Sequence, residues 1–256
     1  MPATHFLFIT LRITAFLAVA PAFASRKIPV RFRILLALFI SIILGMSQIS
    51  SSFFMDSPAS WNTITFCVSA LQEITLGAML GICVLLIFFS LSVLGEAVSS
   101  ASGLSFPVDG GINNQPQTIL TQILYTLGVA IFFIFGGHRL IIATLIKTFT
   151  LHPPGMIAWH QNLFSVVTET FYLGFSLGIQ MALPIFFLLL TCQLILALLY
   201  RVLPQINVFD ISFPLNSLLI LCVLSISLGS ILFIFYENFQ QLIQTIFAHL
   251  NSNFYI

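Results

Sequence analysis

The sequence RVLPQINVFD, residues 201–210, separates two of the longest apolar runs of the chain. It places a cation, a proline and two amides between segments that are otherwise typical of membrane helices. Proline interrupts a helix, and backbone groups released in an apolar environment need new hydrogen-bond partners. Arg201, Gln205 and Asn207 carry donors and acceptors of this kind. We therefore interpret the stretch as a turn between two membrane-type helices.

The composition of the 256-residue chain is that of a polytopic integral membrane protein. Hydrophobic residues make up 59% and charged residues 6%, whereas roughly a quarter of the residues are charged in soluble domains. A helical span needs about 20 residues, so about five to seven spans fit into one domain, residues 1–256. The net charge of +1 and the absence of a basic stripe argue against a nucleic-acid partner.

The cysteines and histidines form no pattern that is typical of a metal site, a disulfide framework or a catalytic site. The cysteines stand alone in apolar segments, and the histidines are scattered without a His-x-x-x-His pair. We expect no cofactor, no metal and no enzymatic activity. The residues concerned are Cys67, Cys83, Cys192, Cys222, His5, His138, His152, His160 and His249.

Six apolar segments cover approximately residues 6–24, 34–50, 64–94, 119–146, 164–199 and 215–237. The third and fifth are longer than the about 20 residues that a straight span needs. The third contains Gly77-x-x-x-Gly81, and the fifth contains Gly174-x-x-x-Gly178 followed by Pro184. Such residues permit close helix contacts and kinks, so we interpret both segments as bent helices or tight hairpins. A single tilted span with incidental small residues is the alternative. The pattern predicts an all-α fold of about six long, kinked helices arranged as helical hairpins.

Two polar stripes run along these apolar segments. The fifth segment carries Glu169, Ser176 and Gln180 at helical spacing, and the fourth opens with Thr118, Gln122 and Tyr125. Each stripe is expected to face protein or water, because polar side chains seldom face lipid. Glu73 lies near the Gly77 face, which favours a helix contact. The alternative is that Glu73 and Glu169 simply reach the membrane interface.

The cations predict the orientation of the chain. Arg26, Lys27, Arg31 and Arg33 cluster in the first connection, which we therefore place in the cytoplasm, with the N-terminus outside. Counting one crossing per segment puts the connections 95–118 and 200–214 inside as well. Lys147 argues mildly against this orientation, because its connection would then lie outside. The triplet 22–24 resembles a signal-peptide cleavage site. Arg12 lies within the apolar run, however, so we favour a retained first helix.

The connection from Gly95 to Thr118 is rich in glycine, proline, asparagine and glutamine. Glycine and proline oppose a regular helix, so we expect a flexible polar loop. Leu104 and Phe106 add apolar side chains that suit the filling of a pore. The alternative is an ordinary exposed loop.

Four groups of residues occur in one order that resembles the flagellar biosynthesis protein FliR family and its relatives in virulence-type secretion systems. The similarity spans about residues 10–240 and departs at Pro107 and at Val108-Asp109-Gly110, where relatives commonly show Asp followed by Pro. The four groups are Gly95-Glu96 with Gly103-Leu104-Ser105 and Asp109; Gly137-His138-Arg139; Phe149 with Pro153-Pro154-Gly155; and Arg201-x-x-Pro204-Gln205-x-Asn207-x-Phe209.

The resemblance implies a non-enzymatic subunit of the flagellar type III protein export gate. It implies a location in the bacterial inner membrane, at the flagellar basal body. The implied partners are the gate subunits FliP and FliQ, the proteins FlhB and FlhA, and unfolded exported polypeptides. Whether the apparatus is flagellar or virulence-related stays open from the sequence alone.

The resemblance also implies roles for two sets of residues. Arg201, Pro204, Gln205, Asn207 and Phe209 are expected to form a structural turn or subunit contact. A pore plug is expected from Gly103, Leu104, Ser105, Phe106, Pro107, Asp109, Gly110, Gly111, Asn113, Asn114 and Gln115.

Two further interpretations remain. A small secondary transporter is the alternative function, with a broken fifth helix and Glu169 and Gln180 at its binding site. The apolar stripe Phe239, Leu242, Ile243, Ile246, Phe247 and Leu250 has a helical period. We interpret it as a partner-facing helix or as an extension of the sixth segment.

Overall fold

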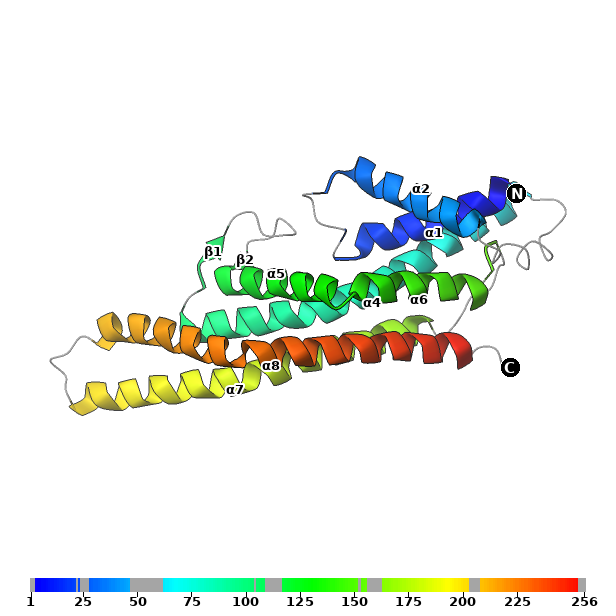
Figure 1. Cartoon of the computed structure of the whole chain (residues 1–256). Helices are drawn as coiled ribbons and strands as arrows, with labels where there is room; N and C mark the ends of the chain where they lie inside the picture. Colours follow the sequence, from blue (N-terminus) through cyan, green and yellow to red (C-terminus); the bar gives the residue numbers. More distant parts are fainter. Residues whose placement is uncertain are drawn as a thin grey trace. The chain divides into compact units, whose positions relative to one another are not determined.

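The computed structural model describes residues 3–21, 23, 28–46, 62–103, 105–108, 117–151, 153–155, 163–202 and 208–252. These residues form an all-α protein, which confirms the predicted fold class (Figure 1). The helices are α1 (Ala3–Val19), α2 (Val30–Met46), α4 (Thr63–Ser102), α5 (Ile119–Ile134), α6 (Gly137–Leu151), α7 (Leu163–Val202) and α8 (Val208–Ser252). A two-residue antiparallel pair, β1 (Pro107–Val108) and β2 (Gln117–Thr118), accompanies them.

Three helices are far longer than a membrane span requires. Helices α4 and α7 each have 40 residues and α8 has 45. Since α4 and α7 run without interruption, the prediction of tight hairpins within 64–94 and 164–199 is wrong, and the bent or tilted helix remains. Pro184 lies inside α7. A proline removes only one backbone donor, which a membrane-type helix tolerates.

Helix α4 also includes Gly95–Ser102, so the prediction of a loop from Gly95 onward is wrong for these residues. No proline or glycine lies between Gly95 and Gly103, and Val98 and Ser99 are fully buried. The helix ends where Gly103 adopts a φ of 76°. Glycine takes this left-handed conformation without steric penalty and commonly terminates helices.

The predicted fourth segment, 119–146, forms two helices instead of one. Helices α5 and α6 are separated by Phe135 and Gly136, and Gly136 has a φ of 73°. The N–H of Gly136 donates to the carbonyl of Phe133 over 3.2 Å, which closes the turn. The bend therefore has a local cause in the glycine backbone.

Three helical stretches in the described part of the chain are long and apolar enough to cross a membrane. They are Thr63–Ser102, Val166–Leu198 and Pro214–Ile246, and α5 with α6 adds a fourth if the bent pair counts as one span. Helices α1 and α2 have only 17 residues each. The three or four candidate spans are fewer than the five to seven expected from chain length, because α4, α7 and α8 take up so much of the chain.

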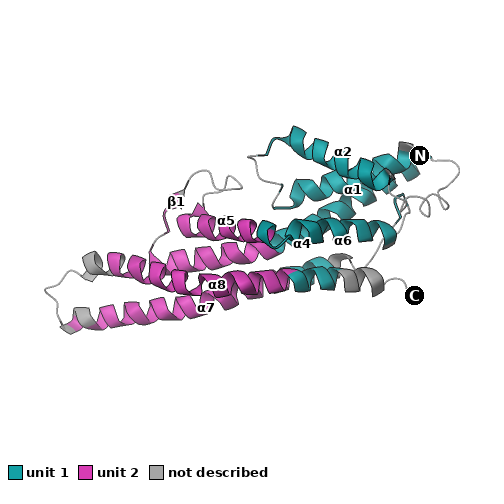
Figure 2. Cartoon of the chain, viewed as in Figure 1, with its two compact units in different colours: residues 1–86, 133–171, 240–256 teal, residues 87–132, 172–239 magenta. Residues whose placement is uncertain are grey.

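The chain divides into two compact units, shown in different colours in Figure 2. Unit 1 consists of residues 1–86, 133–171 and 240–256, and unit 2 of residues 87–132 and 172–239. Helices α4, α7 and α8 each contribute residues to both units. A single export-gate domain over residues 1–256 stays a prediction.

Unit 1 is held together by close helix contacts and an apolar core. Helix α2 packs along α1, and the rings of Phe8 and Phe66 lie 5.3 Å apart. Gly77 and Gly81 lie against the α1 backbone, where a Cβ atom at Gly77 would overlap the carbonyl oxygen of Arg12. This confirms the close approach predicted for Gly77-x-x-x-Gly81. Helix α8 adds Leu242, Ile243 and Ile246 to the core beside residues of α1, α4 and α6.

Unit 2 is organised around an aromatic cluster. Phe88 is 1% exposed, and its ring centroid lies 5.8 Å from Tyr125, 5.6 Å from Phe132 and 5.2 Å from Phe235. Gly178 of α7 meets α4, because a Cβ atom there would come within 2.8 Å of the Ser90 carbonyl oxygen. Helices α4, α5, α7 and α8 therefore share one core within this unit.

The apolar stripe at the C-terminal end belongs to α8. Phe239, Leu242, Ile243 and Ile246 are each at most 5% exposed within the chain itself. Their burial makes the partner-facing interpretation wrong for these four residues, and the extension of the sixth segment is confirmed. The side chains of Phe247 and Leu250 lie outside the described part of the structure.

Candidate functional site

The predicted plug segment is described at its N-terminal end. Gly103, Ser105, Phe106 and Pro107 are all exposed, and Phe106 retains 56% of its surface. Leu104, Asp109, Gly110, Gly111, Asn113, Asn114 and Gln115 lie outside the described residues. Phe106 is therefore an apolar side chain that is exposed beside the end of α4.

The two ends of this segment are joined by backbone and side chains. Pro107 pairs with Thr118 and Val108 with Gln117 in the short β1–β2 pair. The Ser99 hydroxyl, on the last turn of α4, donates to Thr118 Oγ1 over 2.9 Å. Both side chains are buried. The connection between α4 and α5 therefore leaves and returns at nearly the same place.

A carboxylate completes this contact. Glu96 Oε1 accepts hydrogen bonds from Thr121 Oγ1 (2.9 Å), the Thr118 N–H (3.3 Å) and Thr118 Oγ1 (3.4 Å). The Thr118 and Thr121 hydroxyl oxygens lie 2.7 Å apart. We call Glu96, Ser99, Thr118 and Thr121 the Glu96 clasp. A negative charge at the N-terminus of α5 is favourable, because free N–H groups and the helix dipole are positive there.

Helix geometry explains why these residues meet. Thr118 precedes Ile119, the first residue of α5, and its Oγ1 accepts from the Thr121 N–H over 3.4 Å. This is the usual N-cap arrangement for a threonine. Glu96 and Ser99 are three residues apart on α4 and so share a face. Glu96 fell within the predicted loop, so the clasp was not foreseen, although the hydroxyl-rich start of α5 and the lone carboxylate of Glu96 both indicated a polar contact.

The two polar stripes have different environments. In the first stripe Thr118 and Tyr125 are buried and Gln122 is half-buried, which confirms that this stripe faces protein. In the second stripe Glu169 and Gln180 are exposed. Ser176 is half-buried, and its hydroxyl donates to the Leu173 carbonyl of its own helix. The environment of the second stripe outside this chain stays a prediction.

Unit 2 contains a cavity of about 330 Å³ between α7 and α8. It is lined mainly by apolar side chains, with Gln180, Ser227 and Ser230 as polar residues and Pro184 on its wall. The transporter alternative required a broken fifth helix at this place. That premise is wrong, because α7 continues through Pro184.

The predicted turn at 201–210 coincides with a real change of helix. Helix α7 ends at Val202 and α8 begins at Val208. Arg201 is exposed in the last turn of α7, where a cation is favourable for the helix dipole. Phe209 belongs to the first turn of α8. Pro204, Gln205 and Asn207 lie outside the described residues, so their role stays a prediction.

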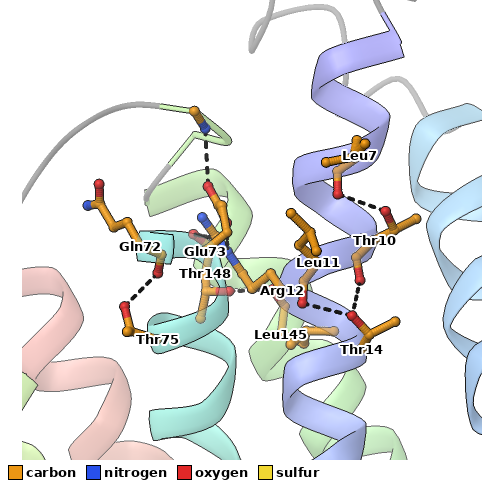
Figure 3. Close-up of polar contacts among 11 residues, drawn as sticks. Leu7, Thr10, Leu11, Arg12, Thr14, Gln72, Glu73, Thr75, Leu145 and Thr148 are labelled. Atoms are coloured by element: carbon orange, nitrogen blue, oxygen red, sulfur yellow. Dashed lines mark hydrogen bonds and ion pairs between the residues drawn. The ribbon is translucent and has the colours of Figure 1, made fainter. Parts of the chain in front are cut away.

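A buried ion pair joins α1 to α4 in unit 1 (Figure 3). Arg12 Nε donates to Glu73 Oε2 over 2.6 Å, and the side chains are 1% and 3% exposed. Arg12 Nη1 also donates to the Thr148 carbonyl over 3.3 Å, and its guanidinium carbon lies 4.4 Å from the centre of the Phe149 ring. The helix contact predicted for Glu73 is confirmed, and the interface alternative is wrong. The packing of Arg12 also makes α1 an integral part of unit 1.

Arg12 and Glu73 were each notable in the sequence, but their pairing was not predicted. Each was the isolated charge of an apolar segment, and such charges need a partner when buried. The opposite charges of Arg12 and Glu73 were therefore a sequence signal for this ion pair. Among the described residues, no cluster of three or more histidine, cysteine or acidic side chains is arranged to hold a metal ion.

Comparison with known proteins identifies similar chains. A family model described as "Bacterial export proteins, family 1" matches residues 3–242. The flagellar biosynthetic protein FliR of Escherichia coli (strain K12) is 34% identical over 214 residues, which cover 80% of this chain and 77% of that protein. FliR of Aquifex aeolicus is 33% identical over 236 residues, 90% of this chain and 87% of that protein. The secretion system apparatus protein SsaT of Salmonella typhimurium is 28% identical over 157 residues, 60% of this chain and 61% of that protein.

Proposed function

The chain belongs to family 1 of the bacterial export proteins, and on this premise we propose that it forms part of the pore through which unfolded polypeptides leave the cytoplasm. It is a non-enzymatic membrane component of the flagellar type III export apparatus. The pore role is supported by Gln180, whose exposed amide on a largely apolar helix is expected to face water or a polar group outside this chain.

The observation that carries the pore proposal is the Glu96 clasp. It ties both ends of the segment between α4 and α5 to buried side chains, and it leaves Phe106 exposed at the start of that segment. We assign residues 103–115 the role of a plug that occludes the path at rest. The clasp gives such a plug a defined base, because Ser99 and Thr121 are fully buried.

The partners follow from the same premise. An export apparatus has several components, and we propose FliP, FliQ, FlhB and FlhA as neighbours in the bacterial inner membrane at the flagellar basal body. The exposed apolar side chains of α7 and α8, such as Phe187 (63%) and Ile226 (83%), offer surface for lipid or other membrane helices. Arg201, Pro204, Gln205, Phe209 and Asn207 are proposed to form a turn or subunit contact.

Deleting residues 103–115 tests the plug. The assembled complex that carries the deletion is expected to leak small solutes, measured as solute efflux from vesicles or as growth sensitivity of cells. A second variant replaces the segment by an equally long Gly/Ser sequence, which keeps the length of the connection and removes Phe106. It should leak as well. Normal assembly with unchanged permeability in both variants would contradict the plug.

Copurification tests the membership of an assembly. A gate subunit should copurify with other helical membrane proteins, whereas a transporter should be stable alone. Replacing Arg201 or Asn207 is expected to reduce the amount of assembled complex more than it changes the selectivity of the pore. Normal assembly of both variants would remove the proposed role of the turn.

A further inference from the structure

The turn that follows α6 is held by side chains of α4. The Gly155 N–H donates to Glu73 Oε1 over 3.1 Å, and Ser69 Oγ lies 3.5 Å from the Gly155 carbonyl oxygen. Gly155 has a φ of 87°, a conformation that favours glycine. Pro154 and Gly155 are buried, as are Ser69 and Glu73. Both backbone polar groups of Gly155 therefore have partners on α4.

The two oxygens of Glu73 contact different parts of unit 1. Oε2 accepts from Arg12 of α1, whereas Oε1 accepts from Gly155 beyond the end of α6. Arg12 in turn reaches the Thr148 carbonyl and the Phe149 ring, both in the last turn of α6. Glu73 and Arg12 point toward each other beside Thr148 in Figure 3. One ion pair thus joins α1, α4, the end of α6 and the turn after it.

Stability alone does not explain this arrangement. Desolvation of two charges commonly offsets their attraction, so a buried ion pair adds little net stability compared with apolar residues of similar volume. A backbone N–H that is buried without a partner is unfavourable, however. The Gly155 N–H needs a buried acceptor, and a carboxylate serves only if a cation such as Arg12 balances its charge.

We propose that Glu73 is a positioning residue that fixes the Pro153–Gly155 turn, and that Arg12 serves Glu73 by neutralising it. Docking of α1 supplies the charge that lets the buried Glu73 carboxylate hold this turn. The contact of Gly77 with the Arg12 backbone supports this role of Arg12. Gly77 lies one helical turn after Glu73 on α4, so it holds α1 close to Glu73.

Two double variants separate positioning from charge pairing. Arg12→Met/Glu73→Met removes both charges and also removes the acceptor for Gly155. Arg12→Met/Glu73→Gln removes both charges but keeps an amide oxygen at the place of the carboxylate. Neither variant leaves an unpaired buried charge, so both are expected to assemble into the export complex.

Hydrogen–deuterium exchange of the purified complex measures the Gly155 N–H directly. The two prolines before Gly155 have no amide hydrogen, so Gly155 carries the first exchangeable amide of a peptide that begins at Pro153, and fragmentation of that peptide separates it from the amides that follow. Exchange should rise by roughly tenfold or more in Arg12→Met/Glu73→Met, because a hydrogen bond that protects the amide is lost. It should stay within about threefold of the parent in Arg12→Met/Glu73→Gln. The Gly229→Ala variant, purified in the same way, shows how much exchange at Gly155 changes through mutation and purification alone.

Three results would overturn the proposal. The first is fast exchange of Gly155 in the unaltered complex. The second is equal exchange in the two double variants, which would show that the turn is held without an acceptor at position 73. The third is failure of Arg12→Met/Glu73→Gln to assemble, since the proposal requires only an acceptor and no net charge.

Discussion

Gly95 of α4 lies so close to Thr121 of α5 that a Cβ atom at Gly95 would come within 2.5 Å of the Thr121 Cα atom. Two of the three nearest atoms, the Thr121 Cα and N, belong to the backbone, which yields less easily than the end of a flexible side chain. We expect Gly95→Ala to destabilise unit 2 by about 1–3 kcal/mol through overpacking. This outweighs the gain in helix propensity of up to about 1 kcal/mol. The measurement is the apparent melting temperature of the purified complex.

The control for this variant is Gly229→Ala in α8. Apart from the neighbouring backbone of its own helix, no atom of the described residues lies within 4 Å of a Cβ built at Gly229, so only helix propensity changes. The melting temperature should stay the same or rise slightly. Equal melting temperatures for Gly95→Ala and Gly229→Ala would show that α4 and α5 are not in close contact at Gly95.

Thr121→Val tests the Glu96 clasp with almost no change of shape. Thr121 is fully buried, and its hydroxyl lies 2.9 Å from Glu96 Oε1 and 2.7 Å from Thr118 Oγ1. Losing it leaves those groups with one partner fewer, so we expect a loss of about 1–3 kcal/mol in the free energy of unfolding. Thr126→Val is the matched control on the exposed side of α5 and should change stability by less than about 0.5 kcal/mol. Denaturant titration of the complex compares the two.

Phe88→Ala removes the centre of the aromatic cluster in unit 2. Phe88 contacts three rings and is 1% exposed, so the substitution is expected to cost about 3–5 kcal/mol. Its sequence neighbour Phe89 is 41% exposed, and Phe89→Ala should cost much less. The yield of folded complex from detergent extracts, followed by thermal denaturation, measures both. Similar losses would mean that the core of this unit is centred elsewhere.

Arg12→Lys retains the charge but not the shape of the guanidinium group. Arg12 uses Nε for Glu73, Nη1 for the Thr148 carbonyl and its planar face for Phe149. A lysine ammonium lacks the fixed fork geometry, so it cannot meet all three partners. We expect a loss of about 1–3 kcal/mol, measured by thermal denaturation. Arg31→Lys on the exposed face of α2 is the control, and an equally small effect for both would contradict the geometry at Arg12.

Much of the helical architecture was predictable from local sequence. Apolar segments of sufficient length formed helices, Gly77, Gly81 and Gly178 marked close helix contacts, and the polar stretch at 201–210 marked the change from α7 to α8. These features depend on hydropathy and on side-chain volume at a few positions. The order of the motifs was sufficient for the family, which the comparisons confirmed.

Other features required the tertiary structure. Gly95 predicted a loop but serves as a contact surface within α4, because Thr121 packs against the space that its missing side chain leaves. Pro184 favoured a bent helix or a tight hairpin, and α7 passes through it as one helix. Glycine and proline permit a turn or a bend without requiring one. Packing partners, which local sequence does not specify, decide between the two outcomes.

Composition, hydrophobic length and ordered motifs are properties of the chain alone, and they were sufficient to identify an all-α, membrane-type export protein. The pairing of Arg12 with Glu73, the hold of Glu73 on Gly155 and the link from Glu96 to the start of α5 depend instead on the folded structure. A charged residue within an apolar segment indicates that a partner is needed, but it does not indicate which one. Its partner is chosen by which helix faces meet, and that is settled by packing across the whole unit.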